Sequence, residues 1–566
     1  MVDSLLRTYL VTFLVFISWA APAGADADAA SQHAIATAHP LATQAGIEVL
    51  NEGGNAFDAA VTVAAVLAVV EPYSSGLGGG GFWLLHRARD NFQIMVDGRE
   101  RAPLAAHRDM YLDSDGNVIP RSSVDGALAA GIPGQVAAMI HINHRYGRLP
   151  LKRLLQPAIL LARKGFMVGA HYRRMAGFRL RALSASPGAR KIFLNKGQVP
   201  EIGSTIVQSD LANTLQRIVD DGHDGFYAGE TANLMVKAVQ QAGGKWTLED
   251  LRQYRVIERR PIIHEWQGMV ITSASLPSSG GIVLAQILNQ LELLGWDRLD
   301  SVTQWQQKTH LLIEAMRRAY HDRALYLGDS DHIAVDVQRL ISGVHAKSLL
   351  SDISRSAATP SEDLAGAITK TTEGKDTTHY SILDREGNRV SATLSINYPF
   401  GSGFVPPGTG VVLNDEMDDF SISPGLPNVY GLVGGEANAI APGKRMLSSM
   451  SPSFVENKDR IMIVGTPGGS RIITMVLHAV LAFRDGLDAE AIVGKPRLHH
   501  QYLPDHIQTE PGALSVSQRK ALEGFGHTVK PVGRRFGNMQ IIVRDKVRKT
   551  VQAASDPRGI GRSTVE

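Results

Sequence analysis

Apolar and polar side chains alternate along residues 389–397, and the preceding run, residues 377–383, begins with two threonines. A period of two is typical of a β-strand. The loop between the runs contains Gly387 and Asn388, which tolerate the positive φ of a hairpin turn. The pattern therefore predicts a β-hairpin in which Thr377 lies opposite Ser395 and their hydroxyls share one face.

Elsewhere, longer segments with apolar residues at helical spacing predict helices. These segments are Ala42–Val70, Gly134–Ile142, Leu151–Arg163, Asp210–Val219, Thr231–Ala242, Gly281–Leu294, Thr303–Leu325 and Ile472–Ala482. Short apolar runs predict further strands at Phe82–Arg87, Gln93–Val96, Gly410–Leu413, Ile461–Val464 and Met539–Val543. Because strands are grouped apart from helices, we expect an α+β fold in which packed sheets are covered by helices.

One stretch, Ser351–Lys375, is rich in small and polar residues and lies immediately before Thr377. Length alone would predict several domains, but no linker, repeat or low-complexity tract divides the chain. We therefore expect a single intertwined unit, with this stretch as a flexible segment beside a point of cleavage.

The N-terminus has the pattern of an export signal. Residues 1–25 contain Arg7, an apolar run from Tyr9 to Ala21, and small residues that predict cleavage after Ala23 or Ala25. The run is short for a membrane span, and no later stretch reaches the ~20 apolar residues that a span needs. We expect a periplasmic or secreted protein with no membrane partner; an uncleaved anchor is the alternative.

Composition narrows the classes of function. The 566 residues include no cysteine, which excludes disulfides and thiolate metal sites. The formal net charge of +3 is nearly balanced and gives no reason to expect a nucleic-acid partner. His499 and His500 are adjacent, so they would point apart on regular structure, and no HExxH motif is present. We expect no metal and no other cofactor.

The glycine run at residues 76–81 formally matches the G-x-G-x-x-G pattern of dinucleotide sites. Such a site needs a strand before the glycines and a helix after them, whereas here a predicted helix precedes and a predicted strand follows. We expect instead a loop packed so closely that any Cβ would clash.

Thr377 is a candidate nucleophile. A threonine hydroxyl needs a base, and the nearest one is the residue's own α-amine, which exists only if the chain is cut before it. A free α-amine titrates near ~7.7–8.0, so it accepts a proton at neutral pH. The segment therefore suggests a precursor that cleaves itself between Asp376 and Thr377; an ordinary strand beginning with two threonines is the alternative.

Several short motifs are spread over the chain. Those in the C-terminal part are Thr377–Ser381, Asn414–Phe420, Pro427–Gly435, Arg445–Pro452 and Gly465–Arg471. Those in the N-terminal part are His39–Ala42, Gly53–Ala60, Gly78–Phe82, Arg99-Glu100 before Ala102-Pro103, and Pro277–Gly281. Together, and in this order, they resemble the gamma-glutamyltransferase (glutathione hydrolase) family.

The resemblance implies the four-layer αββα sandwich of the N-terminal-nucleophile hydrolases, built from two fragments of one precursor. After a signal peptide at residues 1–25, residues 26–376 would form the large subunit and residues 377–566 the small, catalytic subunit. The two fragments would remain together as a heterodimer.

The resemblance also implies the catalytic roles. The Thr377 hydroxyl would attack a γ-glutamyl amide carbonyl, and Ser395 would hold that hydroxyl and the amine in position. The family more often has threonine at the position of Ser395. The backbone amides of Gly468 and Gly469 would stabilise the oxyanion; from the residues alone, this glycine pair is a plain turn before a helix.

Further residues would hold the zwitterionic end of the substrate. Arg99 suits the α-carboxylate, with hydroxyls from Ser448 and Ser449. Glu416 and Asp419 are the anions for the α-amine, beside Asn397; some relatives carry glutamine at the position of Glu416. Tyr430 resembles the tyrosine of the family's lid, which bonds the asparagine that matches Asn397 and closes the pocket from water.

We therefore predict an enzyme that passes a γ-glutamyl group, with glutathione as the expected donor, to water or to an amino-acid or peptide acceptor. A glutaryl-amide or cephalosporin acylase, or a poly-γ-glutamate hydrolase, of the same superfamily is the alternative within the same chemistry. An uncleaved, non-catalytic periplasmic binding protein is the alternative from another class.

Overall fold

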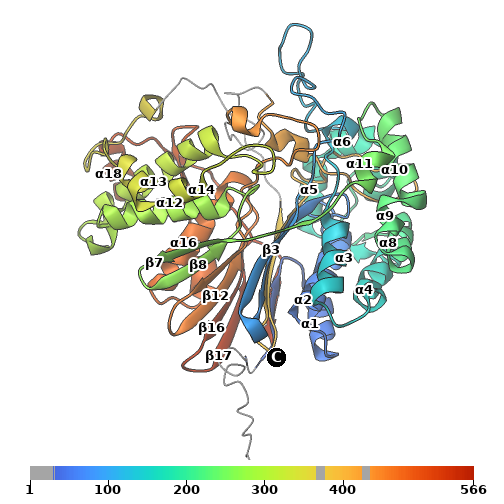
Figure 1. Ribbon diagram of the computed structural model, residues 1–566, viewed down its shortest axis with the longest axis horizontal. Helices are drawn as coiled ribbons and strands as arrows, with labels where there is room; N and C mark the ends of the chain where they lie inside the picture. The colour runs from blue at the N-terminus through green and yellow to red at the C-terminus, as the bar shows by residue number, and fades with distance from the viewer. Residues whose placement is uncertain (1–29, 31, 365–376, 423–433) are drawn as a thin grey trace, which may run out of the picture.

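The computed structural model describes residues 30, 32–364, 377–422 and 434–566, and two large β-sheets form its centre (Figure 1). The first sheet has the strand order β18 (Arg562–Val565), β1 (Ala34–Thr37), β9 (Thr378–Leu383), β10 (Arg389–Ser395), β2 (Gly80–Arg87), β3 (Phe92–Gly98) and β6 (Ile257–Arg259). The second has the order β17 (Thr550–Ser555), β16 (Gln540–Asp545), β12 (Arg460–Gly465), β11 (Ser453–Glu456), β8 (Met269–Ser273) and β7 (Ile262–Trp266).

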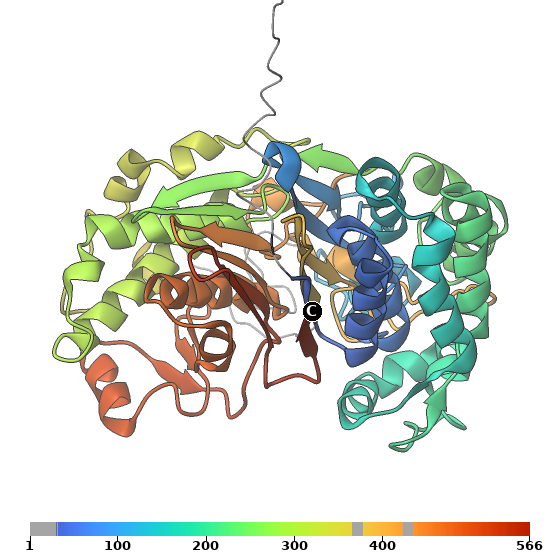
Figure 2. The same ribbon diagram turned by 90° about the horizontal axis from the view of Figure 1, so that it is seen from below.

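Helices cover the outer side of each sheet, as Figures 1 and 2 show from two directions. On the side of the first sheet lie α1 (Pro40–Asn51), α2 (Ala56–Val70), α3 (Gln135–Tyr146), α4 (Leu151–Lys164), α5 (Ala170–Phe178), α6 (Leu180–Ala185), α7 (Pro187–Phe193), α8 (Ser209–Asp221), α9 (Asp224–Tyr227), α10 (Gly229–Gln241) and α11 (Leu248–Arg252). On the side of the second lie α12 (Gly280–Leu293), α13 (Trp305–Tyr326), α14 (Val337–Leu340), α15 (Gly343–Ser348), α16 (Ile472–Arg484), α17 (Ala489–Gly494) and α18 (Val516–Gly524).

The expected α+β fold is therefore confirmed as four layers, helices–sheet–sheet–helices. Two small sheets lie outside these layers: β4 (Phe166–Met167) with β5 (Thr205–Ile206), and β13 (Leu498–His499) with β14 (Ile507–Thr509) and β15 (Val529–Pro531). In the part of the chain that the structure describes, no helix is long and apolar enough to cross a membrane.

Two predicted elements are wrong. The helix expected over Ala42–Val70 is two helices, because Gly53 adopts a φ of 93° and Asn55 caps α2 by accepting hydrogen bonds from the Phe57 and Asp58 amides. The strand expected at Gly410–Leu413 is a loop, in which Gly410 has a φ of 67°. The other predicted helices and strands are present with their ends shifted by a few residues.

The predicted hairpin is confirmed in its register. Leu383 pairs with Arg389 and Thr378 pairs with Leu394, which brings Thr377 opposite Ser395. Side chains on both faces of β9 and β10 are buried, so the polar face does not meet solvent. The apolar face packs against the helices of the first sheet's side, and the polar face packs against the second sheet.

Hydrogen bonds between the two sheets explain why that polar face is buried. The Ser391 hydroxyl donates to the Val464 carbonyl at 3.0 Å, and the Ser381 hydroxyl donates to the Gln540 carbonyl at 3.0 Å. Gly465 leaves room for the His379 ring, since a Cβ there would lie 2.2 Å from a ring carbon. Buried hydroxyls that find such partners avoid the cost of desolvation.

Candidate active site

Thr377 and Ser395 lie at the open end of the hairpin. Thr377 immediately precedes β9, and Ser395 is the last residue of β10. Their hydroxyl oxygens are 3.5 Å apart, and both side chains are buried. The Ser395 hydroxyl accepts the Asn397 amide proton at 2.8 Å, and the Glu416 carboxylate also forms a hydrogen bond with it. The nucleophile predicted from sequence is thus next to the hydroxyl predicted to hold it.

The glycine run packs directly behind this pair. A Cβ on Gly79 would lie 2.1 Å from the Ser395 carbonyl oxygen, and one on Gly78 would lie 2.1 Å from the Val412 carbonyl oxygen. Strand β2 follows the glycines, and α2 precedes them. The expectation of close packing is confirmed, and the strand–glycines–helix order of a dinucleotide site is not present.

One cavity is lined by most of the residues proposed for the site. Its lining comes from both sheets and from the loops that join them. The lining residues are Arg99, Arg323, Thr377, Ser395, Asn397, Glu416, Asp419, Ser448, Ser449, Met450, Gly469, Ser470 and Ile472. Residues separated by hundreds of positions in the chain therefore meet at one cavity.

Arg99, just after β3, is the most strongly paired cation of this cavity. Its Nη1 lies 2.6 Å from Glu416 Oε2, and its Nη2 lies 2.6 Å from Asp419 Oδ2. Both carboxylates come from one 3₁₀ turn, Glu416–Asp419. The arginine is 1% exposed, so these pairs stand in a low-dielectric setting where charge pairing is strong.

Burial sets the protonation of the carboxyl groups. It raises the pKa of Glu416 to about 7, although the Arg99 guanidinium opposes this shift. Glu100, fully buried beside them, has a pKa well above its usual range, because burial and the Glu416 charge disfavour its ionised form. Glu416 therefore titrates near neutral pH.

The glycine pair opens a short 3₁₀ turn, Gly469–Arg471, that leads into α16. Gly468 has a φ of 143° and Gly469 a φ of 59°, conformations that L side chains rarely adopt. The Tyr320 hydroxyl donates to the Ser470 carbonyl at 2.5 Å, and the Ser470 hydroxyl donates to Gln501 Oε1 at 2.6 Å. Gly469 lines the cavity, whereas Gly468 lies just before it in the turn.

Ser448 and Ser449 also line the cavity, on the chain that leads into β11. The Ser448 hydroxyl accepts the Met450 amide proton at 3.0 Å. The Ser449 hydroxyl accepts from Arg323, a residue that sequence reasoning missed. An arginine within a long helix such as α13 is usually solvent-exposed, so nothing in the pattern indicated that Arg323 would reach the cavity.

Two predicted residues lie outside the part that the structure describes: Asp376, on the far side of the expected cleavage point, and Tyr430 of the expected lid.

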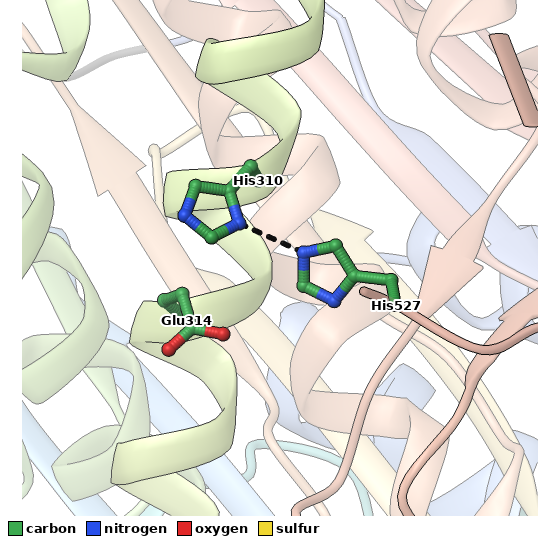
Figure 3. A group of neighbouring side chains, drawn as sticks. All are labelled: His310, Glu314 and His527. Atoms are coloured by element: carbon green, nitrogen blue, oxygen red, sulfur yellow. Dashed lines mark hydrogen bonds between the residues drawn. The ribbon is translucent and has the colours of Figure 1, made fainter. Parts of the chain in front are cut away.

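Within the described residues, one group of histidine and carboxylate side chains is compact enough to hold a metal ion: His310, Glu314 and His527 (Figure 3). His310 Nε2 donates to the Ser354 carbonyl at 2.9 Å, so its Nδ1 accepts from His527 Nε2 at 2.8 Å. Glu314 is held by two arginines. Both nitrogens of His310, Nε2 of His527 and both oxygens of Glu314 are thus already engaged, whereas His527 Nδ1 has no hydrogen-bond partner among the described residues.

The positive charges of the arginines beside Glu314 also disfavour the binding of a metal cation. Arg318 Nη1 lies 2.6 Å from Glu314 Oε2, and Arg317 Nε lies 3.3 Å from Glu314 Oε1. Although burial disfavours the ionised carboxylate, these arginines lower the pKa of Glu314 overall. The group is a buried polar core that joins α13 to the C-terminal region.

The sequence is similar to a known protein family and to its characterised relatives over most of its length. The family model described as gamma-glutamyltranspeptidase matches residues 42–565. A glutathione hydrolase proenzyme of Pseudomonas sp. (strain A14) is 43% identical over 91% of this chain and 88% of that protein. A glutathione hydrolase proenzyme of Escherichia coli K12 is 41% identical over 94% of this chain and 91% of that protein.

Solved structures agree in fold. A cephalosporin acylase from Bacillus halodurans has a TM-score of 0.82 at 27% identity and covers 100% of this chain and 99% of its own. A gamma-glutamyltranspeptidase chain from Helicobacter pylori has a TM-score of 0.55 at 41% identity and covers 57% of this chain and 92% of its own.

Proposed function

The chain belongs to the gamma-glutamyltranspeptidase family, and we propose that it cleaves itself before Thr377 and then acts as a glutathione hydrolase and gamma-glutamyltransferase. The observation that carries this proposal is the position of Thr377. It begins an inner strand, lies beside Ser395, and shares one cavity with an arginine and two carboxylates.

Cleavage is proposed between Asp376 and Thr377. The Thr377 hydroxyl attacks the Asp376 carbonyl and the peptide C–N bond breaks, which moves the acyl group onto the oxygen and frees the α-amine. Water then hydrolyses this ester, which restores the Thr377 hydroxyl and releases the Asp376 carboxylate. Residues 26–376 and 377–566 are the two proposed fragments, with residues 1–25 as a signal for export to the periplasm or medium. Each of the two large sheets contains strands from both sides of the cut, so separation would expose sheet edges and core. The fragments are therefore expected to remain a heterodimer.

In the proposed reaction, the free α-amine of Thr377 takes the hydroxyl proton as the oxygen attacks the γ-carbonyl of the donor. The Ser395 hydroxyl holds the nucleophile in place. The amides of Gly468 and Gly469 stabilise the oxyanion, and loss of one such donor costs about 3–4 kcal/mol. The protonated amine then passes its proton to the leaving group, and water or an acceptor amine takes the γ-glutamyl group.

The proposed recognition of the donor uses opposite charges on one wall. Arg99, with the hydroxyls of Ser448 and Ser449, receives the α-carboxylate. Glu416 and Asp419, with Asn397, receive the α-amine. The donor's α-carboxylate would pair with Arg99, and its α-amine would pair with Glu416 and Asp419. These pairs would replace part of the pairing between Arg99 and the two carboxylates, so little charge is left unpaired on binding.

These carboxylates also separate the proposal from the acylase alternative. A glutaryl group has a carboxylate but no α-amine, so it would leave Asp419 and an ionised Glu416 without a cationic ligand. A γ-glutamyl group satisfies both ends. The pairing of Arg99 with two carboxylates therefore favours γ-glutamyl donors.

The test is N-terminal sequencing of the smaller fragment, together with the variant Thr377→Ala. We expect wild-type protein to yield a fragment that starts at Thr377 and to hydrolyse γ-glutamyl-p-nitroanilide. Thr377→Ala should remain a full-length, inactive chain, because it lacks the attacking oxygen. A wild-type fragment that starts elsewhere, or full processing of the variant, would show that another residue makes the cut.

A further inference from the structure

The cavity contains two arginines with unlike surroundings. Arg99 pairs with Glu416 and Asp419, whereas the guanidinium of Arg323, from α13, donates hydrogen bonds to two serine hydroxyls. Arg323 Nε donates to the Ser279 hydroxyl at 2.9 Å, and its Nη2 donates to the Ser449 hydroxyl at 3.1 Å. Throughout residues 32–364, 377–422 and 434–566, no carboxylate lies within ion-pair distance of Arg323.

A buried cation without an anion is costly, since burial removes its hydration. The Arg323 side chain is 5% exposed and lines the cavity. Burial lowers the pKa of Arg323 to about 10, and the neighbouring Arg99 guanidinium adds to this effect. Tyr320 and Asp419 oppose this effect, and the group is protonated at neutral pH. The cavity therefore keeps a positive charge with no carboxylate of the described residues within 4.0 Å.

The hydrogen bond from Arg323 to the Ser449 oxygen determines where the Ser449 hydroxyl can donate its own proton. Because the Ser449 oxygen accepts from Arg323, its own O–H is left to donate elsewhere, and in the described part of the chain it donates to no acceptor. Ser449 lines the cavity beside Ser448, whose oxygen likewise accepts a proton from a backbone amide. Two hydroxyl protons and one guanidinium are therefore available to an anion at this wall.

We propose that Arg323 is a second, specificity-determining cation for the carboxylate end of the substrate. It adds positive charge beside that group and, through its hydrogen bond, orients the Ser449 hydroxyl toward it. This inference rests on the function proposed above and assigns Arg323 to recognition of the donor's α-carboxylate, together with Arg99. Arg323 acts as a positioning residue through Ser449, not as a reacting group.

Three compounds distinguish recognition of the donor's α-carboxylate from recognition of its α-amine. The first is γ-glutamyl-p-nitroanilide, which has both α-groups. The second is glutaryl-p-nitroanilide, which keeps the carboxylate and lacks the amine. The third is 4-aminobutanoyl-p-nitroanilide, which keeps the amine and lacks the carboxylate. KM is measured for the first, and inhibition constants against its hydrolysis are measured for the other two.

We expect Arg323→Gln to raise KM for the γ-glutamyl anilide and the inhibition constant of the glutaryl anilide about 10- to 100-fold, the effect of losing a hydrogen bond to a charged group. The inhibition constant of the 4-aminobutanoyl anilide and kcat should change less than about 3-fold. Arg298→Gln, which removes an exposed arginine far from the lining residues, is the matched control and should leave all constants unchanged.

An equal change for all three ligands, or a loss confined to kcat, would overturn the proposal. If Arg323→Gln is not processed, Arg323→Lys provides the test, since lysine keeps the charge but lacks the planar arrangement of donors that reaches Ser279 and Ser449 from different nitrogens. It should raise the constants of the two carboxylate ligands about 3- to 10-fold. Unchanged constants in that variant would make Arg323 structural only. Failure of the proposed function would be seen separately, because the wild-type protein would then yield no fragment that starts at Thr377 or would not hydrolyse γ-glutamyl-p-nitroanilide.

Discussion

The substrate cavity and the His310–Glu314–His527 group both bury arginines, carboxylates and hydrogen-bonding side chains, yet they differ in how completely these groups are paired (Figure 3). In the histidine group, both oxygens of Glu314 face arginines, and the two imidazoles are linked to each other and to the Ser354 carbonyl. In the cavity, Arg323 has no carboxylate and the Ser449 proton has no acceptor within the described chain.

The difference teaches that burial of charge does not by itself mark a binding site. A group whose charges compensate one another contributes to folding, because breaking it leaves an unpaired charge in the interior. A group in which a charged side chain lines a cavity and has no oppositely charged side chain beside it can bind a ligand of opposite charge. Changes in the first should therefore affect stability, and changes in the second should affect substrate affinity.

The largest expected effect is on stability, from Glu314→Gln. Removing this carboxylate leaves Arg317 and Arg318 with less compensation in a buried setting, which should cost about 3 kcal/mol of the free energy of unfolding. Chemical denaturation of the variant measures this loss, while KM for γ-glutamyl-p-nitroanilide should stay within about 3-fold of wild type.

The control for that change is Glu249→Gln, which breaks an exposed pair with Arg252 and should not move the denaturation midpoint. Large kinetic changes with unchanged stability in Glu314→Gln would mean that the histidine group takes part in substrate binding, and the comparison would fail.

The next effect is on affinity, from Arg99→Gln. Loss of this guanidinium should raise KM for γ-glutamyl-p-nitroanilide about 100-fold, because a charge-assisted pair to the α-carboxylate is lost. The inhibition constant of 4-aminobutanoyl-p-nitroanilide, which has no carboxylate, should not rise. Steady-state kinetics on processed enzyme measure both constants, and equal losses for the two compounds would remove Arg99 from carboxylate recognition.

The smallest effect is a pH dependence from Glu416. Its pKa of about 7 means that the carboxyl is neutral below that pH and anionic above it. Affinity for the cationic α-amine should therefore improve about 3-fold between pH 6 and pH 8, a modest gain because Asp419 supplies a second anion. Glutaryl-p-nitroanilide, which has no amine, should show no such gain.

Glu416→Gln sharpens that test, since an amide does not titrate in this range. The variant should lose the pH dependence of affinity while keeping the pH dependence of kcat that the Thr377 α-amine imposes. A variant that retains the full change in affinity would assign it to another group.

Much of the nucleophile hairpin could be predicted from sequence, because a strand period of two and a short loop leave one register for residues 377–397. The glycine run was also predictable as a close-packing element, since its order of helix, glycines and strand contradicts a nucleotide site. In both cases the pattern that led to the prediction is local, although the glycines pack against the distant carbonyls of Ser395 and Val412.

Local pattern misjudged the length of the first helix, because a stretch rich in alanine and valine outweighed the glycine pair and the Asn55 cap. It also gave no indication of what the polar face of the hairpin packs against. The structure buries that face against the second sheet, where carbonyls of Val464 and Gln540 accept the serine hydroxyls. Such partners lie about 70 to 160 positions away, so no periodicity indicates them.

The sequence by itself determined the hairpin, the glycine loop and, through its motifs, the family and the candidate nucleophile. Only the tertiary structure decided that Arg99 faces Glu416 and Asp419, that Arg323 reaches the same cavity, and that the histidine group is closed on itself. The physical reason is range: backbone preference and side-chain period act between neighbours, whereas charge compensation is set by residues that only folding brings together.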